Sequence, residues 1–186
     1  MGAWNYATIF EICADNVPEA PALIHSERRI SWGEFDRRAD GVARTLLDAG
    51  AQHQDKVAQY LYNGPEYLEA TFGCFKARSV PVNVNYRYTE AELQYLLDNA
   101  DAAAVIVSAE LAERLDLVRA RLSLLRLVVQ VGDGPTFGDA IRYEAALAAA
   151  DPAPRIARSP DDLWFLYTGG TTGMPKGVMW PHRSIV

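Results

Sequence analysis

One stretch near the carboxyl end dominates the sequence, Tyr-Thr-Gly-Gly-Thr-Thr-Gly-Met-Pro-Lys-Gly at residues 167–177. Four glycines, three threonines and one lysine are crowded there between two apolar runs, 163–167 and 178–180. Glycine lets the backbone take positive φ and lets its N–H groups approach an anion closely, threonine hydroxyls donate further hydrogen bonds, and lysine adds a full positive charge. The stretch therefore has the chemistry of a loop that binds phosphate groups.

A plain turn between two strands is the alternative interpretation of this stretch. Each glycine costs about 0.5 to 1 kcal/mol in chain entropy relative to alanine, so four glycines together lower the folding stability by about 2 to 4 kcal/mol. A tight turn needs only one or two of them, and hydroxyls and a lysine add nothing to it. We therefore predict a phosphate-binding site, with Lys176 stabilising the phosphate charge. Its residues are Thr168, Gly169, Gly170, Thr171, Thr172, Gly173, Lys176 and Gly177.

Two common nucleotide-binding motifs do not match this loop. A Walker A loop requires Gly-Lys followed by Ser or Thr at the start of a helix. Here Pro175 precedes Lys176, Gly177 follows it, and residues 178–180 are typical of a strand. The dinucleotide fingerprint requires a glycine triplet that opens a helix, whereas Gly132 and its neighbours indicate a turn. The spacing excludes both motifs.

Residues 168–177 resemble the signature loop of the AMP-forming adenylating enzymes, which include acyl-CoA synthetases, luciferases and the adenylation domains of peptide synthetases. The wider match, 166–180, is most similar to bacterial fatty acyl-CoA synthetases, including those that act on steroid side chains. Gly169 departs from the pattern, because many members carry a serine there. His182 and Arg183 resemble the His-Arg pair that commonly follows the loop.

This resemblance implies an ATP-dependent ligase reaction. Family members join a carboxylate to AMP, release pyrophosphate, and pass the acyl group to a thiol, usually that of coenzyme A. The implied cofactors of an intact enzyme are ATP, Mg²⁺ and coenzyme A, and the implied substrate is a fatty-acid-like carboxylate. Lys176, with the hydroxyls of Thr171 and Thr172, would stabilise the negative charge that builds on the departing pyrophosphate.

Family members run to several hundred residues. Their parts that grip adenine and ribose, hold magnesium, line the acyl pocket and supply a C-terminal catalytic lysine all follow the loop. We therefore expect a truncated or split N-terminal part of an acyl-CoA ligase, whose partner is the C-terminal part. Two alternatives stay open: a non-catalytic module that binds a nucleotide or pyrophosphate, and a remnant that pairs with a full-length relative.

Upstream of the loop, helix-like and strand-like patterns alternate. The clearest helix follows Ser31, where Glu34 completes a capping box, the apolar face includes Phe35 and Leu46, and Gly50 can cap the end. Apolar strands are predicted at 57–62, 80–84, 103–107 and 127–131, with helices after the first three. This order predicts an α/β fold, with a doubly wound, mostly parallel sheet and helices on both faces. Together with the resemblance, it implies the incomplete N-terminal portion of an adenylating-enzyme large domain.

Proline-containing segments suggest a division near residue 160. Pro152, Pro154 and Pro160 interrupt the helical pattern that ends near residue 150. We expect residues 1–160 to form an N-terminal α/β subdomain with this linker at its end. Residues 161–186 would then supply a strand, the loop, a second strand and the start of the next element.

Composition narrows the class of protein. The chain has 186 residues, 49% of them hydrophobic, and a net charge of -6 without a lysine cluster, which argues against nucleic acid or an anionic membrane surface as a partner. No apolar run approaches the roughly 20 residues that span a bilayer, so we expect a cytoplasmic protein. Cys13 and Cys74 are predicted to be reduced core thiols, and His25, His53 and His182 lack metal-ligand spacing, so no metal site is predicted.

Overall fold

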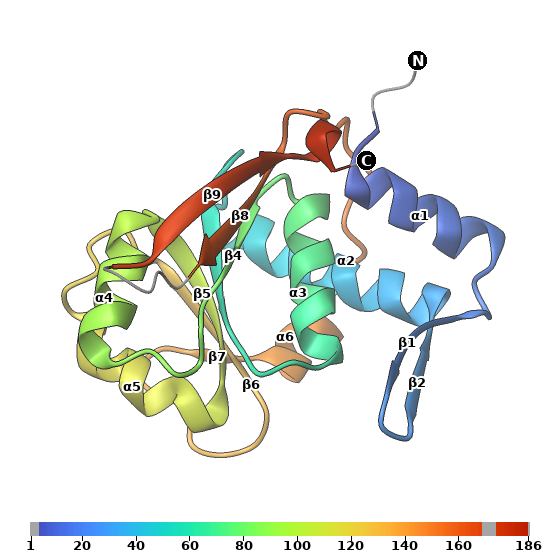
Figure 1. The fold of residues 1–186 in the computed structure, drawn as a ribbon. Helices are drawn as coiled ribbons and strands as arrows, with labels where there is room; N and C mark the ends of the chain where they lie inside the picture. Colours follow the sequence, from blue (N-terminus) through green and yellow to red (C-terminus); the bar gives the residue numbers. More distant parts are fainter. Residues whose placement is uncertain (1–3, 169–173, 186) are drawn as a thin grey trace.

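The computed structural model describes residues 4–168 and 174–185. Within these residues the main sheet has seven strands (Figure 1). They are β3 (Lys56–Tyr60), β4 (Val80–Asn83), β5 (Ala102–Ser108), β6 (Leu127–Val131), β7 (Ile141–Arg142), β8 (Leu163–Thr168) and β9 (Lys176–Pro181). Their spatial order is β7-β6-β5-β3-β4-β8-β9, and every neighbouring pair is parallel except β8 and β9. The predicted α/β, mostly parallel sheet is confirmed.

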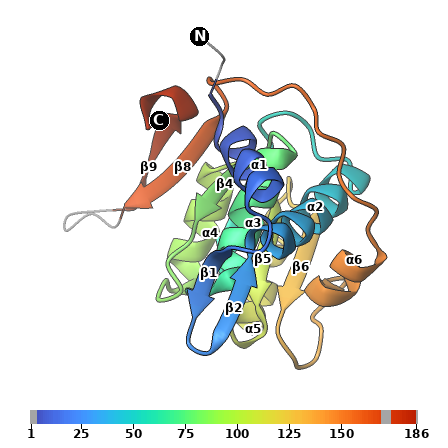
Figure 2. The same cartoon turned by 90° about the vertical axis from the view of Figure 1, so that its right-hand side faces the viewer.

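Helices cover both faces of this sheet, as Figure 2 shows. The helices are α1 (Tyr6–Asn16), α2 (Trp32–Asp48), α3 (Pro65–Lys76), α4 (Glu90–Asn99), α5 (Ala109–Arg119) and α6 (Tyr143–Ala149), with a short 3₁₀ turn η1 (His182–Ser184). Helices α4 and α5 share one apolar core with the sheet, and α2, α3 and α6 share the core on the opposite face. A hairpin of β1 (Pro21–His25) and β2 (Arg28–Ser31) packs with α1 outside α2 and α3.

Helix α2 forms where the local signals predict it. The Ser31 hydroxyl accepts a hydrogen bond from the backbone N–H of Glu34 and so satisfies one of the free donors at the helix start. Phe35, Ala39, Val42 and Leu46 are all buried, in keeping with a helical period of 3.6 residues. Ala49 follows the helix as its C-cap. The predicted helix and its inner face are therefore confirmed.

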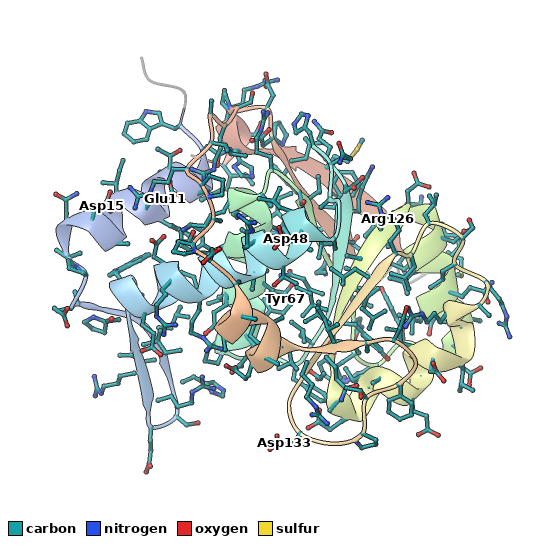
Figure 3. All side chains as sticks on the ribbon, turned by 180° about the vertical axis from the view of Figure 1, so that it is seen from behind. Glu11, Asp15, Asp48, Tyr67, Arg126 and Asp133 are labelled. Carbon is teal, nitrogen blue, oxygen red and sulfur yellow. The ribbon has the colours of Figure 1, made fainter. Side chains whose placement is uncertain are left out.

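The segment between α6 and β8, residues 150–162, carries no helix and lies against α1. Arg158, almost fully buried, makes two hydrogen bonds to the carboxylate of Glu11, and Arg155 makes two to Asp15. Figure 3 shows that Glu11 and Asp15 both belong to α1. The buried ammonium of Lys76 completes the network, because it lies between the carboxylates of Asp36 and Glu11. Ion pairs therefore tie this segment to the helical layer before the chain re-enters the sheet.

Candidate functional site

The arms of the predicted phosphate loop are the antiparallel strands β8 and β9. Thr168 ends β8 and lies directly opposite Lys176, which begins β9. Directly opposed residues of an antiparallel pair place their side chains on the same face, and both residues are exposed. The predicted site residues Gly169, Gly170, Thr171, Thr172 and Gly173 lie outside the described residues. The hydroxyl of Thr168 and the ammonium of Lys176 are thus neighbouring, accessible donors at the loop end of the hairpin.

The next pair inward, Tyr167 and Gly177, packs closely across the two arms. Tyr167 is buried, and Gly177 lies opposite it in the register. A Cβ atom added to Gly177 would come within 2.9 Å of the Tyr167 ring carbons. Glycine is therefore required at 177 for close packing against the tyrosine ring.

The carboxyl ends of β3 and β4 form a crevice beside these arms. Strand β3 continues into α3 on one face of the sheet, whereas its neighbour β4 continues into α4 on the opposite face. Two adjacent strands whose connections leave toward opposite faces mark the place where open α/β sheets bind ligands. A hollow of about 260 Å³ lies there. It is lined by Leu61, Asn63, Tyr67, Asn83, Val84, Asn85, Tyr86, Tyr88 and Tyr167.

Among the residues that the structure describes, the lining of this hollow is polar and carries no charged side chain. It combines three asparagine carboxamides with four tyrosine rings. Burial raises the pKa of Tyr67 to about 12, so this phenol is neutral at physiological pH. Because Tyr167 lines the hollow and directly precedes Thr168, the hollow borders the first arm of the loop.

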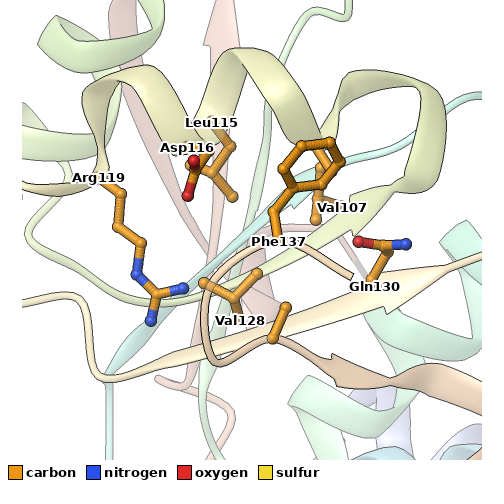
Figure 4. A pocket seen from close by; sticks show the side chains of 9 residues that line it. Val107, Leu115, Asp116, Arg119, Val128, Gln130 and Phe137 are labelled. Atoms are coloured by element: carbon orange, nitrogen blue, oxygen red, sulfur yellow. The ribbon is translucent and has the colours of Figure 1, made fainter. Parts of the chain in front are cut away.

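A small cavity beneath α5, shown in Figure 4, contrasts with the hollow at the sheet edge. Its volume is about 10 Å³, which is room for roughly one water molecule. Its walls include Val107, Leu115 and Phe137, and Nε2 of Gln130 donates a hydrogen bond to the carbonyl of Pro135. This cavity is a packing gap and is too small for a substrate.

The far end of the β8–β9 hairpin is anchored by Asp162. Its carboxylate accepts hydrogen bonds from the guanidinium of Arg78 at 2.7 Å and from the side chain of Asn5 at 3.1 Å. Burial opposes the charge on Asp162, yet hydrogen bonds from Arg78, the Ser159 N–H and His53 lower its pKa below the usual value. This anchor keeps β8 in place relative to α1 and the loop that precedes β4.

His182 and Arg183 follow β9 and belong to the same anchor. His182 is fully buried against Phe75, and its Nδ1 accepts a hydrogen bond from the Tyr6 N–H at 3.2 Å. Burial lowers the pKa of His182 to about 4, so the imidazole is neutral. Arg183 is ion-paired with Asp161. His182 therefore holds the end of β9 against α1, and Arg183 holds it against the segment that precedes β8.

Sequence reasoning missed the residues that support the loop. Asn83 is the polar last residue of an otherwise apolar strand, and that position at a carboxyl end is a signal that could have drawn attention to it. Asp162 and Arg78 carry no comparable signal, since they are 84 residues apart. Within residues 4–168 and 174–185, no group of three or more His, Cys, Asp or Glu is arranged to hold a metal ion. None of the described helices is long and apolar enough to cross a membrane.

Comparison with known families assigns the chain to one of them. The model of the AMP-binding enzyme family matches residues 10–186. The chain belongs to the AMP-binding enzyme family. Among curated relatives of this chain, the 3-oxocholest-4-en-26-oate–CoA ligase of Rhodococcus rhodochrous is 41% identical over 98% of the chain and 34% of its own length. The medium-chain acyl-CoA ligase Mig of Mycobacterium avium is 37% identical over 98% of the chain and 36% of its own length. The chain thus spans about a third of these relatives.

Solved structures show the same fold. The anthranilate CoA ligase AuaEII, solved with anthranoyl-AMP, superposes with a TM-score of 0.91 at 23% identity and covers 97% of this chain and 35% of its own. MbtA of Mycobacterium smegmatis superposes with a TM-score of 0.87 at 27% identity, with coverages of 98% and 34%. The chain therefore has the architecture of the matching third of these proteins.

Proposed function

We propose that this chain carries the ATP phosphate-binding loop of an AMP-forming fatty acyl-CoA ligase that acts in the cytoplasm. In this proposal residues 1–160 are the α/β scaffold, and residues 161–186 carry the loop. The substrate is a fatty-acid-like carboxylate, in line with the relatives, which are a 3-oxocholest-4-en-26-oate–CoA ligase and a medium-chain acyl-CoA ligase. One observation carries the proposal: exposed Lys176 lies opposite Thr168 at the loop end of a hairpin whose connecting sequence, residues 169–175, contains three glycines and two threonines.

The lysine inventory supports Lys176 as the phosphate contact. The sequence contains three lysines, at positions 56, 76 and 176. Lys76 is buried among carboxylates, and Lys56 begins β3 at the amino-terminal edge of the sheet, opposite the loop. Lys176 is thus the lysine at the ligand-binding edge. A charge-assisted contact to phosphate contributes about 1.5 to 3 kcal/mol.

The phosphates of ATP suit the hydrogen-bond donors at the loop end of the hairpin. No residues are assigned to the other two implied cofactors, Mg²⁺ and coenzyme A. The Thr168 hydroxyl and the Lys176 ammonium suit the β- and γ-phosphates, and fixed donors stabilise charge on departing pyrophosphate. The described part of the chain offers no cluster of carboxylates for Mg²⁺. We assign neither magnesium nor coenzyme A to particular side chains.

The first test of this proposal is pyrophosphate binding by the purified chain, measured by titration calorimetry. Lys176→Ala should weaken binding about 10-fold or more, because it deletes a charge-assisted contact. Lys56→Ala is the matched control and should bind as the wild type does. Equal affinities for wild type and Lys176→Ala, or no binding by either, would reject the phosphate site.

The second test addresses adenylation. Carboxylate-dependent exchange of labelled pyrophosphate into ATP reports the first half-reaction, and we would measure it with a panel of medium- and long-chain fatty acids. The chain would be assayed alone and mixed with the remaining two thirds of the Rhodococcus relative. Exchange that depends on Lys176, with the chain alone or in the mixture, supports the proposed ligase function. Tight pyrophosphate binding without exchange in both would instead favour the non-catalytic binding module.

A further inference from the structure

Asn83 binds both backbone groups of Tyr167, the residue that directly precedes Thr168. The N–H of Tyr167 donates to Asn83 Oδ1 at 2.6 Å, and Asn83 Nδ2 donates to the Tyr167 carbonyl at 3.0 Å. A carboxamide offers one acceptor and a pair of donor hydrogens in one plane, so it can reproduce the two hydrogen bonds that a neighbouring strand would supply. The side chain of Asn83 therefore continues the sheet beyond the end of β4.

This continuation is needed because β4 and β8 pair over a very short length. Their register joins Val82 to Phe165, and β4 ends at Asn83. Without a partner, the last residues of β8 would present unpaired backbone groups beside the hollow, and buried unpaired groups are costly. Asn83 supplies that partner at Tyr167, one residue before the end of β8.

The side chain of Tyr167 holds the second arm. Its ring is buried, and its hydroxyl donates to Oδ1 of Asn99, the last residue of α4, at 2.8 Å. The ring also fills the space beside Gly177, where a Cβ atom would meet it at 2.9 Å. Tyr167 is thus fixed from β4 through its backbone and from α4 through its hydroxyl, and it in turn contacts the strand that carries Lys176.

We propose that Asn83, Asn99 and Tyr167 are positioning residues that hold the two arms of the phosphate loop at a set separation before the ligand binds. This inference rests on the proposed function, because it assigns how the same loop is preorganised. A loop whose arms are already fixed loses less conformational freedom when it binds, so it binds more tightly. None of the three residues needs to contact phosphate for this effect.

Two tyrosine-to-phenylalanine variants separate positioning from general stability. Tyr167→Phe removes the hydroxyl that bonds to Asn99 at 2.8 Å, and Tyr143→Phe removes a hydroxyl that bonds to Glu69 at 2.9 Å on α3. Both rings are buried, and both changes delete one hydrogen bond without touching the backbone bonds of the hairpin. The two variants differ in whether the lost bond lies beside the loop.

Amide hydrogen exchange is the direct readout of how firmly the arms are held. Tyr167→Phe should speed exchange at residues 166–168 and 176–178 about five-fold, the effect of losing one ordinary hydrogen bond. Asn99→Ala should do the same, whereas Asn99→Asp, which keeps an acceptor for the hydroxyl, should exchange as the wild type does. Tyr143→Phe should leave these amides unchanged. Unchanged exchange in both Tyr167→Phe and Asn99→Ala overturns the inference.

Pyrophosphate titration at a temperature where every variant is folded completes the test. We expect Tyr167→Phe and Asn99→Ala to bind several-fold more weakly than wild type, and Asn99→Asp and Tyr143→Phe to bind equally. Faster exchange with unaltered affinity overturns the positioning role. If wild-type chain and Lys176→Ala bind alike, the proposed function fails, and the exchange measurement still decides whether these residues hold the arms.

Discussion

Gly177 packs directly against the ring of Tyr167 near the loop end of the β8–β9 hairpin. Sequence reasoning assigned Gly177 to the phosphate loop for its backbone freedom. The structure adds a steric requirement, because the position faces an aromatic ring at 2.9 Å from an added Cβ. Such a contact joins residues ten apart through strand pairing, so no local pattern predicts it.

Gly177→Ala should destabilise the chain by about 1 to 3 kcal/mol, since the new methyl group must displace a buried ring. Urea denaturation monitored by circular dichroism measures this change. Gly64→Ala is the control, because Gly64 has extended backbone and its nearest neighbour is the flexible carboxylate of Glu66. Equal loss of stability in the two variants would contradict the steric argument.

His182 links stability to pH through burial. Its pKa falls from 6.5 to about 4 in the folded chain, while the unfolded chain keeps the ordinary value. Below pH 6.5 the unfolded state therefore takes up a proton that the folded state refuses. The stabilising contribution is fully present above pH 6.5 and is lost as the pH falls through about 4.

The free energy of unfolding should accordingly fall between pH 7 and pH 4.5 more steeply in wild type than in His182→Gln, which does not titrate. The difference should be on the order of 2 to 3 kcal/mol. Urea midpoints at several pH values give this slope, and His25→Gln serves as a control for an exposed histidine. Parallel pH profiles for wild type and His182→Gln would refute the buried neutral histidine.

Among the elements, α2 was predictable and the α6–β8 segment was not. Helix α2 is predicted by its Ser31 cap, its apolar period and a nearby glycine, all within 20 residues. The α6–β8 segment is held instead by pairs such as Arg158 with Glu11, which are 147 residues apart. An isolated arginine and glutamate have no sequence pattern that identifies them as partners, so sequence indicated only a proline-containing linker.

Arg158→Ala should lower the free energy of unfolding by about 3 to 5 kcal/mol, because it leaves the buried carboxylate of Glu11 without its main partner. Arg44→Ala breaks an exposed pair with Asp48 on α2 and should cost less than about 1 kcal/mol. Chemical denaturation compares the two. The double variant Arg158→Met with Glu11→Met should recover part of the lost stability. If Arg158→Ala costs no more stability than Arg44→Ala, the α6–β8 segment is not held by the pair of Arg158 and Glu11.

At the scale of the whole molecule, the alternation of strands and helices predicted the fold class but not the order of strands. Strand β3 comes first in the main sheet yet lies between β4 and β5. That placement arises because the chain crosses to one side through α3 and returns to the other through α4. Local periodicity reports which residues are buried and says nothing of which side a crossover takes, so the crevice at β3 and β4 could not be located from sequence.

The same strand order leaves β9 at the edge of the sheet with exposed apolar side chains. Within the described residues Met179 is 62% exposed and Val178 and Trp180 are about 40% exposed. An edge strand presents unpaired backbone groups, and an apolar edge is prone to pair with other chains. We expect concentrated solutions of the chain to self-associate and to bind hydrophobic dyes through this strand.

Met179→Lys should reduce both effects, since a charged side chain opposes pairing at a strand edge. Ile24→Lys is a closely matched control, because Ile24 is 61% exposed but lies in the separate β1–β2 hairpin. Sedimentation velocity over a range of concentrations, with dye fluorescence on the same samples, measures the change. If the two variants lower self-association equally, association depends on net charge and not on β9, because both substitutions add the same charge at similar exposure.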